Sequence, residues 1–214
     1  QGGFSAGIMV TASHNPPRDN GYKVYLGGPN GGSQIIPPVD SEMAAEIESV
    51  ASSKAFATIP MSDQFKVGGS ELQEDYLRIT AGLISNERDR APLSTIYTAM
   101  HGVGLETLQS LLNLAGVAEP TLVARQVQPD ATFPTTPFPN PEEAGAMDLS
   151  FELARELSAD LIIATDPDAD RLAVGVPAAH GFYRLAGDEV GLILADELAT
   201  REGASGNMAN SIVS

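Results

Sequence analysis

The chain of 214 residues contains no cysteine and no tryptophan. Without cysteine it can form neither disulfides nor thiolate metal sites, and this composition is typical of proteins in a reducing cytoplasm. No apolar run approaches the roughly 20 residues that a bilayer crossing requires, and the first residues do not show the basic and apolar pattern of a signal peptide. We therefore expect a cytoplasmic protein without a membrane partner.

Basic residues are also scarce, since 12 lysines and arginines face 28 aspartates and glutamates, for a formal net charge of -16. Such a charge repels nucleic-acid phosphates and anionic lipids at long range, so we expect neither as a partner. A phosphorylated small molecule remains compatible with this charge. Its phosphate would have to be bound locally, by a metal ion or by a few arginines and lysines.

The first residue is not methionine, and residues 211–214 look like a strand that is just beginning. These features predict an internal piece of a longer protein. A chain of this length can hold one large domain or two ordinary ones, each with a sizeable core.

The first part of the chain predicts a small sheet with helices. Residues 7–10 look like a buried strand, and residues 21–26 alternate as a strand does, followed by a glycine-rich turn at 27–32 that predicts a hairpin. Apolar residues recur at helical spacing over 39–52, where Asp40 would cap the helix, and over 71–84. The stretch 53–70 looks like a connection.

From Pro92 onward, strands and helices alternate, which predicts parallel strands joined by helical crossovers. The predicted fold is α/β, with three-layer α/β/α domains and mixed, mainly parallel sheets. The predicted strands are 94–100, 120–124 and 161–165, with a further strand pair at 172–177 and 182–185. The predicted helices are 105–114, 142–157 and 188–200.

An acidic loop, Asp166-Pro167-Asp168-Ala169-Asp170-Arg171, directly follows the apolar strand 161–165. Ligands of open α/β sheets bind beyond the carboxyl ends of strands, and alternate carboxylates of an extended loop can face one hard cation such as Mg²⁺. An EF-hand is excluded because its glycine and glutamate positions hold Arg171 and Pro177. An acidic surface loop without a binding function remains an alternative.

The same loop is similar to the Asp-x-Asp motif of haloacid-dehalogenase-type phosphatases, in which the first aspartate, here Asp166, would be the nucleophile. That motif usually continues with a small residue and then threonine or valine, where this chain has Asp170. This alternative stays open.

Ser13 lies in Thr11-Ala12-Ser13-His14-Asn15-Pro16, after an apolar run and before a proline pair that turns the chain. The residues alone favour a turn or helix-capping role on an exposed loop. A serine hydrolase is disfavoured, because the Gly-x-Ser-x-Gly elbow is missing and the histidines are limited to His14, His101 and His180. His101 could be a packed residue or a ligand, and we assign no role to His180.

Taken together, the serine motif, the following Asn20-Gly21-Tyr22-Lys23 and the acidic loop resemble the α-D-phosphohexomutases, the phosphoglucomutase and phosphomannomutase enzymes. Residues 99–104 and 138–143 are most similar to the phosphoglucomutase and phosphopentomutase branch. The resemblance covers essentially the whole chain. It implies the later part of domain 1 at 1–70, a connecting helix and linker at 71–91, domain 2 at 92–203 and the start of domain 3 at 204–214.

The resemblance also implies a function, namely transfer of a phosphoryl group between the 1- and 6- (or 5-) hydroxyls of a hexose or pentose phosphate. Ser13 would be the phosphoserine, and a phosphate oxygen on it would join Asp166, Asp168 and Asp170 around one Mg²⁺. His14 and Lys23 would stabilise charge and move a proton, while Arg171, with Lys23, would bind substrate. A sugar bisphosphate would be the intermediate and activator.

Two of these residues also have simpler interpretations. Lys23 could be a solvated strand lysine, and Arg171 could be a structural ion-pair partner of the acidic loop. A non-catalytic metal-binding module is a further alternative. The sequence does not separate glucose, mannose and pentose phosphates or fix the oligomeric state, and we expect this segment alone to be inactive.

Overall fold

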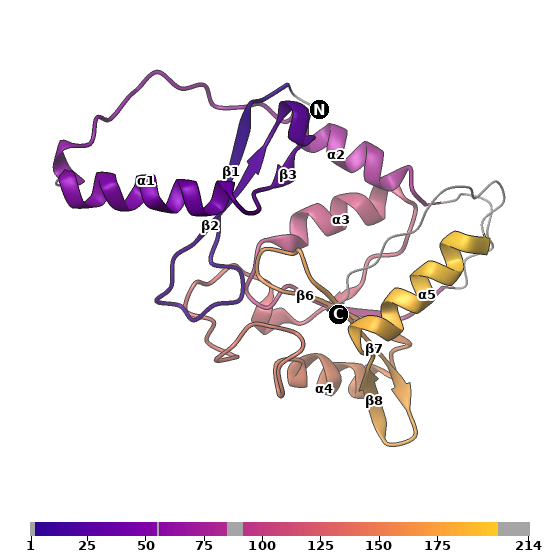
Figure 1. Cartoon of the computed structure of the whole chain (residues 1–214). Coiled ribbons are helices and arrows are strands. Elements are labelled where there is room, and N and C mark those ends of the chain that lie inside the picture. Colours follow the sequence, from indigo (N-terminus) through magenta and orange to yellow (C-terminus); the bar gives the residue numbers. More distant parts are fainter. Residues whose placement is uncertain (1–2, 55, 85–91, 201–214) are drawn as a thin grey trace. The chain divides into compact units, whose positions relative to one another are not determined.

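The computed structural model describes residues 3–54, 56–84 and 92–200 (Figure 1). The chain divides into two compact units, one of residues 1–12 and 20–76, the other of residues 13–19 and 77–214. The predicted strand at 211–214, the predicted start of a third domain at 204–214 and most of the predicted linker after residue 84 lie outside the described residues. Among the described helices, none is long and apolar enough to cross a membrane.

The first unit contains an antiparallel sheet in the order β1-β2-β3, made of β1 (Ala6–Val10), β2 (Tyr22–Leu26) and β3 (Ser33–Gln34). The predicted hairpin is confirmed between β2 and β3, with the 3-10 turn η1 (Gly28–Asn30) at its tip. Val24 is the buried centre of β2. The expectation of a buried first strand is wrong: β1 is exposed at all five positions, because it forms the edge of this sheet.

The helices of the first part are α1 (Val39–Ser53) and α2 (Glu71–Ala81), with the short η2 (Phe56–Thr58) in the otherwise irregular connection. The prediction that Asp40 caps α1 is wrong. Pro38 is the N-cap residue, and the Asp40 carboxylate accepts a hydrogen bond from the adjacent Ser41 N at 2.8 Å. Asp40 therefore lies within the first turn, where a negative charge is favourable near the helix N-terminus.

The second unit contains a five-stranded sheet in the order β5-β4-β6-β7-β8. Its strands are β4 (Thr95–Thr98), β5 (Thr121–Leu122), β6 (Leu161–Thr165), β7 (Leu172–Ala178) and β8 (Gly181–Arg184). The mixed α/β fold is confirmed. Strand β4 pairs in parallel with β5 and β6, whereas β6–β7 and β7–β8 are antiparallel, because the loops between them are too short for a crossover.

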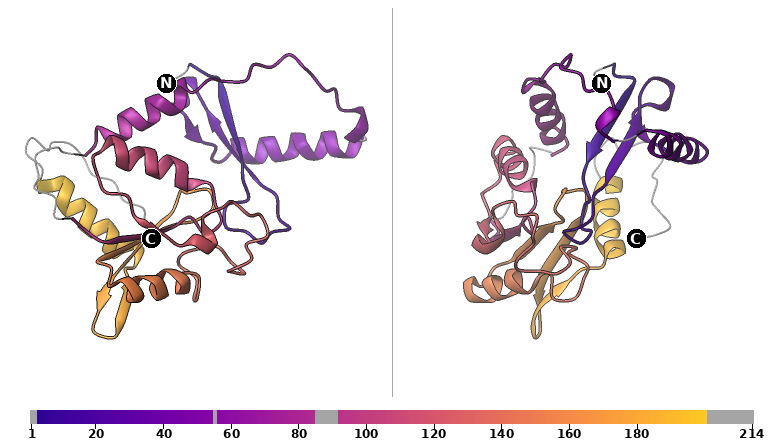
Figure 2. Two further views of the ribbon diagram at one scale, coloured as in Figure 1. Left: turned by 180° about the vertical axis from the view of Figure 1, so that it is seen from behind. Right: turned by 90° about the vertical axis from the view of Figure 1, so that its left-hand side faces the viewer.

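Within the described residues 92–200, the α-helices are α3 (Gly104–Leu114), α4 (Asp148–Leu157) and α5 (Gly187–Thr200). Figure 2 shows α4 and α5 on opposite sides of β7. The core lies between α4 and the sheet, where Ile96, Ile162 and Ala154 are completely buried. The Phe151 ring of α4 stacks on Phe182 of β8 with 6.5 Å between centroids.

The predicted helix 142–157 is too long, because α4 begins only at Asp148. Residues 142–147 form turns instead, and Gly145 has a φ of +83°, a conformation that an α-helix does not contain. Two of these turn residues, Ala146 and Met147, still enter the core. Their apolar character extended the helical pattern beyond the helix.

Candidate active site

The serine loop joins β1 to β2, and its base is closed by a hydrogen bond from Thr11 N to Gly21 O of 3.1 Å. Position 21 must be glycine, since a Cβ there would lie 2.6 Å from the Thr11 carbonyl oxygen. Beyond this base, residues 13–19 belong to the second unit. Ser13 is half-buried and has a φ of +54°, a left-handed conformation that is uncommon for a residue other than glycine.

The acidic loop begins where β6 ends, and Asp166 is its anchor. The Asp166 side chain is completely buried, and its Oδ1 accepts a hydrogen bond from Arg171 N at 3.1 Å. The Ala169 N donates to Asp166 O at 3.0 Å, which closes the loop into a turn with Ala169 at a φ of +58°. The loop thus folds back on Asp166.

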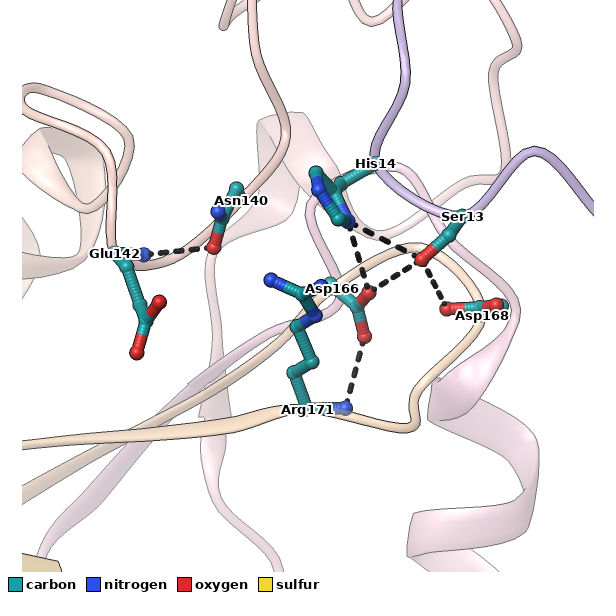
Figure 3. Close-up of polar contacts among 7 residues, drawn as sticks. All are labelled: Ser13, His14, Asn140, Glu142, Asp166, Asp168 and Arg171. Carbon is teal, nitrogen blue, oxygen red and sulfur yellow. Dashed lines mark hydrogen bonds and ion pairs between the residues drawn. The ribbon is translucent and has the colours of Figure 1, made fainter. Parts of the chain in front are cut away.

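Ser13 and the acidic loop meet directly (Figure 3). The Ser13 Oγ lies 3.0 Å from Asp166 Oδ2 and 3.0 Å from Asp168 Oδ1. The three carboxylates of Asp166, Asp168 and Asp170 each offer an oxygen, and these oxygens all lie within 4.8 Å of one another. The structure therefore brings together all four sequence-predicted ligands, although Ser13 and Asp166 are 153 positions apart in the chain.

His14 lies on the other side of the same hydroxyl. Its Nδ1 is 3.2 Å from Ser13 Oγ and 3.9 Å from Asp166 Oδ2. The imidazole is within reach of a proton on Ser13 Oγ, while its side chain is 26% exposed and so accessible to solvent. An imidazole that contacts both a hydroxyl and a buried carboxylate can act as a proton carrier.

The electrostatics of the loop are set by its crowded carboxylates. Burial and, after it, the neighbouring Asp168 carboxyl raise the pKa of Asp166 from its ordinary value of 3.8 to about 6. Hydrogen bonds from Arg171 N and Ser13 oppose this rise in pKa. A divalent cation bound at this loop would favour the charged form of Asp166, because its positive charge would offset the effects of burial and of the neighbouring carboxylate.

The remaining predicted residues lie in different environments. The Arg171 guanidinium makes no ion pair with the described residues, and in Figure 3 it lies on the side of Asp166 opposite to Asp168. A structural ion pair with the acidic loop is therefore not its role in this structure. Lys23 lies in β2 of the first unit, opposite Met9. His180 is exposed in the turn between β7 and β8.

Sequence reasoning missed the support beneath the acidic loop. Tyr97 of β4 is buried, and its hydroxyl lies 2.9 Å from Thr165 Oγ1, one residue before Asp166. Burial raises the pKa of Tyr97, so its hydroxyl stays protonated. The available signal was a tyrosine within a predicted strand, since a buried tyrosine hydroxyl needs a hydrogen-bond partner.

A second missed feature is a polar network at the end of β4. The Gln126 side chain accepts a hydrogen bond from Thr98 Oγ1 at 2.6 Å and donates to Thr135 Oγ1 at 2.9 Å. The same Thr135 hydroxyl lies 2.8 Å from His101 Nε2. His101 is thus a packed residue within the second unit, and its ring nitrogen is engaged away from the acidic loop.

Comparisons with known proteins agree with this fold. Residues 1–54 match the family description "Phosphoglucomutase/phosphomannomutase, alpha/beta/alpha domain I", and residues 74–179 match domain II of the same family. A Burkholderia thailandensis phosphoglucomutase/phosphomannomutase family protein has a similar structure, with a TM-score of 0.67 over 91% of this chain and 38% of that protein. At 23% identity, this likeness shows the fold alone.

Relatives in sequence point the same way. A probable phosphomannomutase of Haemophilus influenzae is 50% identical over 98% of this chain and 43% of that protein. A probable phosphoribomutase of Schizosaccharomyces pombe is 40% identical over 90% of this chain and 34% of that protein. The chain spans less than half the length of these relatives.

The fold and the acidic loop define α/β/α domains of the phosphoglucomutase/phosphomannomutase type. The chain belongs to the α-D-phosphohexomutase superfamily.

Proposed function

We propose that this chain carries the phosphoserine and metal-binding loops of a phosphosugar mutase. Its substrate would be a hexose or pentose phosphate, whose phosphoryl group moves between the 1- and 6- (or 5-) hydroxyls through a sugar bisphosphate. The observation that carries the proposal is the position of Ser13 Oγ, 3.0 Å from carboxylates of both Asp166 and Asp168. The names of the relatives, a phosphomannomutase and a phosphoribomutase, support this substrate class.

The acidic loop fits a hard divalent cation. Its three carboxylate oxygens converge within 4.8 Å, and oxygen donors of this kind suit Mg²⁺. Asp166, Asp168 and Asp170 would hold the ion, together with an oxygen of phosphorylated Ser13. When bound, the ion would neutralise charge on the phosphoryl group and polarise it for attack.

The transfer itself would use the residues around Ser13. The oxygen of the sugar hydroxyl forms a bond to phosphorus while the bond from phosphorus to Ser13 Oγ breaks, and a proton passes from the sugar hydroxyl to Ser13 Oγ. His14 Nδ1 lies 3.2 Å from Ser13 Oγ and is therefore placed to carry this proton. Transfer back from the reoriented bisphosphate restores phosphoserine.

Charged side chains would bind the substrate. The Arg171 guanidinium is exposed, follows the acidic loop and has no ion pair among the described residues, so it is available to a substrate phosphate. We also assign Lys23 a role in stabilising negative charge during the transfer. This assignment rests on the sequence resemblance, in which the Ser13 motif is followed by the segment that ends at Lys23. In a chain with a net charge of -16, these local cations oppose the long-range repulsion of a phosphorylated sugar.

The alternative with Asp166 as nucleophile is less well supported. Asp166 is completely buried, and its two oxygens already accept hydrogen bonds from Ser13 Oγ and Arg171 N. A nucleophile needs access to phosphorus, and Asp166 is completely buried whereas Ser13 is half-buried.

A phosphorylation experiment tests the proposal. The intact protein is incubated with glucose 1,6-bisphosphate and Mg²⁺, and peptides are analysed by mass spectrometry. We expect a phosphate increment on the Ser13 peptide, and we expect Ser13→Ala to lower glucose 1-phosphate isomerisation by roughly a thousand-fold or more. Ser41→Ala is the matched control, because Ser41 is an exposed serine whose hydroxyl also contacts a carboxylate, at 3.3 Å from Asp40 Oδ1.

Three outcomes would contradict the mutase. Near-native turnover of Ser13→Ala would remove Ser13 from the reaction. A phosphate on Asp166 that hydroxylamine releases would favour an aspartyl phosphatase, since acyl phosphates are cleaved by hydroxylamine and phosphoserine is not. Metal binding without any phosphoryl transfer would favour a non-catalytic module.

A further inference from the structure

The acidic loop packs against the turn that follows β4, at residues 99–104 of the second unit. We propose that Gly102 and Gly104 of this turn are positioning residues, whose missing side chains let the turn hold the loop of Asp166, Asp168 and Asp170 in its metal-binding shape. This inference rests on the proposed metal site.

Gly102 contacts the loop through its backbone. A Cβ at position 102 would lie 2.3 Å from Pro167 Cα, 2.4 Å from Pro167 O and 2.7 Å from Pro167 C. Real Cβ atoms do not approach a backbone so closely, and these atoms cannot rotate away as a side chain would. The φ of Gly102 is not positive, so close approach rather than backbone conformation explains glycine here.

Gly104, at the start of α3, contacts the other half of the loop. A Cβ there would lie 2.9 Å from Ala169 Cβ, 3.0 Å from the Tyr97 hydroxyl and 3.2 Å from Thr165 Oγ1. Between the two glycines, Val103 N donates a hydrogen bond to Pro167 O at 2.9 Å. The turn therefore meets the loop on both sides of Asp168.

The turn is itself firmly anchored, so it can serve as a template. Met100 and His101 have φ values of +47° and +62°, which residues with side chains rarely adopt unless their surroundings hold them there. His101 N donates to Gln126 O at 3.1 Å, and its carbonyl accepts from Asp130 N at 3.0 Å. Its imidazole lies 2.8 Å from Thr135 Oγ1.

Such contacts matter because the loop holds three carboxylates that repel one another when no cation is present. Groups outside the ligand set that orient metal ligands typically change metal affinity by 10- to about 100-fold when they are altered. Displacing Pro167 or Ala169 would shift the spacing of Asp166, Asp168 and Asp170. Metal affinity is therefore the property that this packing controls.

Titration of the full chain with Mn²⁺, followed by the electron paramagnetic resonance signal of free Mn²⁺, tests the inference. We expect Gly102→Ala to weaken Mn²⁺ binding by about 10-fold or more. Gly175→Ala is the matched control, because a Cβ in β7 would crowd Ile162 at 3.1 Å and Phe151 at 3.3 Å in the core. It should lower thermal stability without changing Mn²⁺ affinity, which separates positioning from destabilisation.

A second pair of variants guards against misfolding of Gly102→Ala. Gly104→Ala should also weaken Mn²⁺ binding, and adding Ala169→Gly should restore part of the affinity, since it removes the closest atom that the new methyl group meets. The φ of +58° at Ala169 suits glycine, so the second substitution adds no strain.

The outcomes are distinct. If the unchanged chain binds no Mn²⁺, the proposed metal site fails and this inference fails with it. If the unchanged chain binds Mn²⁺ and Gly102→Ala and Gly104→Ala bind it equally well, only the inference is overturned. Equal weakening by Gly175→Ala, or no recovery in Gly104→Ala with Ala169→Gly, would also overturn it.

Discussion

Replacing Asp166 by asparagine should stabilise the metal-free chain at neutral pH. The pKa of Asp166 is raised from 3.8 to about 6 by burial and by Asp168, so the folded state favours its protonated form. The shift of about two units corresponds to roughly 3 kcal/mol of stability that is present below the unfolded-state pKa and is lost as pH rises through the folded-state pKa. Asparagine keeps the shape of the side chain without the charge.

Urea unfolding in EDTA, followed by far-ultraviolet circular dichroism, measures this effect. We compare the free energies of unfolding of the unchanged chain and of Asp166→Asn at about pH 4, near the lower end of the window in which the carboxyl titrates, and at about pH 7.5, above that window. The difference should shift in favour of Asp166→Asn by roughly 2 to 3 kcal/mol at the higher pH. Comparing the two proteins cancels the acid denaturation that all other carboxylates share.

Asp196→Asn provides the control, because Asp196 is an exposed carboxylate on α5 of the same unit and its replacement should change the free energy of unfolding by no more than about 0.5 kcal/mol. The reasoning would be refuted if the difference in free energy of unfolding between Asp166→Asn and the unchanged chain were the same at both pH values. A lower stability of the variant at neutral pH would also refute it. Adding Mg²⁺ at neutral pH should reverse the order, since only the unchanged chain gains stability by binding the ion.

Three stability predictions concern the support of the site, each measured by urea unfolding. Ile162→Ala, which empties a completely buried position, should cost about 3 kcal/mol, and the exposed Leu192→Ala should stay within about 0.5 kcal/mol. Tyr97→Phe should cost about 1 kcal/mol, because it removes the hydrogen bond to Thr165. Gln126→Ala should cost more than Tyr97→Phe, roughly 1 to 3 kcal/mol, since it leaves Thr98 without an acceptor. Equal stability of Gln126→Ala and the unchanged chain would contradict the role of the network.

The acidic loop could be predicted from the sequence because its signal is local. An apolar strand directly followed by alternating aspartates specifies both the strand end and the convergence of the carboxylates, and the structure places their oxygens within 4.8 Å. The contact with Ser13 has no such signal. It joins residues 153 positions apart, and only the combination of two motifs in one family pointed to it.

Other features depend on tertiary packing that periodicity does not encode. The apolar residues Ala146 and Met147 continue the helical pattern of α4, yet they enter the core from turns. The short loop between β7 and β8 made their antiparallel pairing predictable from the sequence. The pairing of β7 with β6 could not be predicted in the same way. The polar network around Gln126 left no pattern, because its members are single polar residues from the end of β4 and from segments far along the chain.

The site combines two opposing requirements that the variants separate. For the proposed metal site, the carboxylates would have to converge before the ion arrives, and Asp166 is buried with a raised pKa that disfavours its charge. The repulsion between the carboxylates lowers the stability of the metal-free fold. Metal binding would relieve this repulsion, so the stability of the metal-free fold and the metal affinity are linked. Asp166→Asn removes the charge and leaves the geometry, so it should stabilise the metal-free chain and abolish binding. Gly102→Ala leaves every charge and disturbs the geometry, so it should weaken binding without that gain in stability at neutral pH.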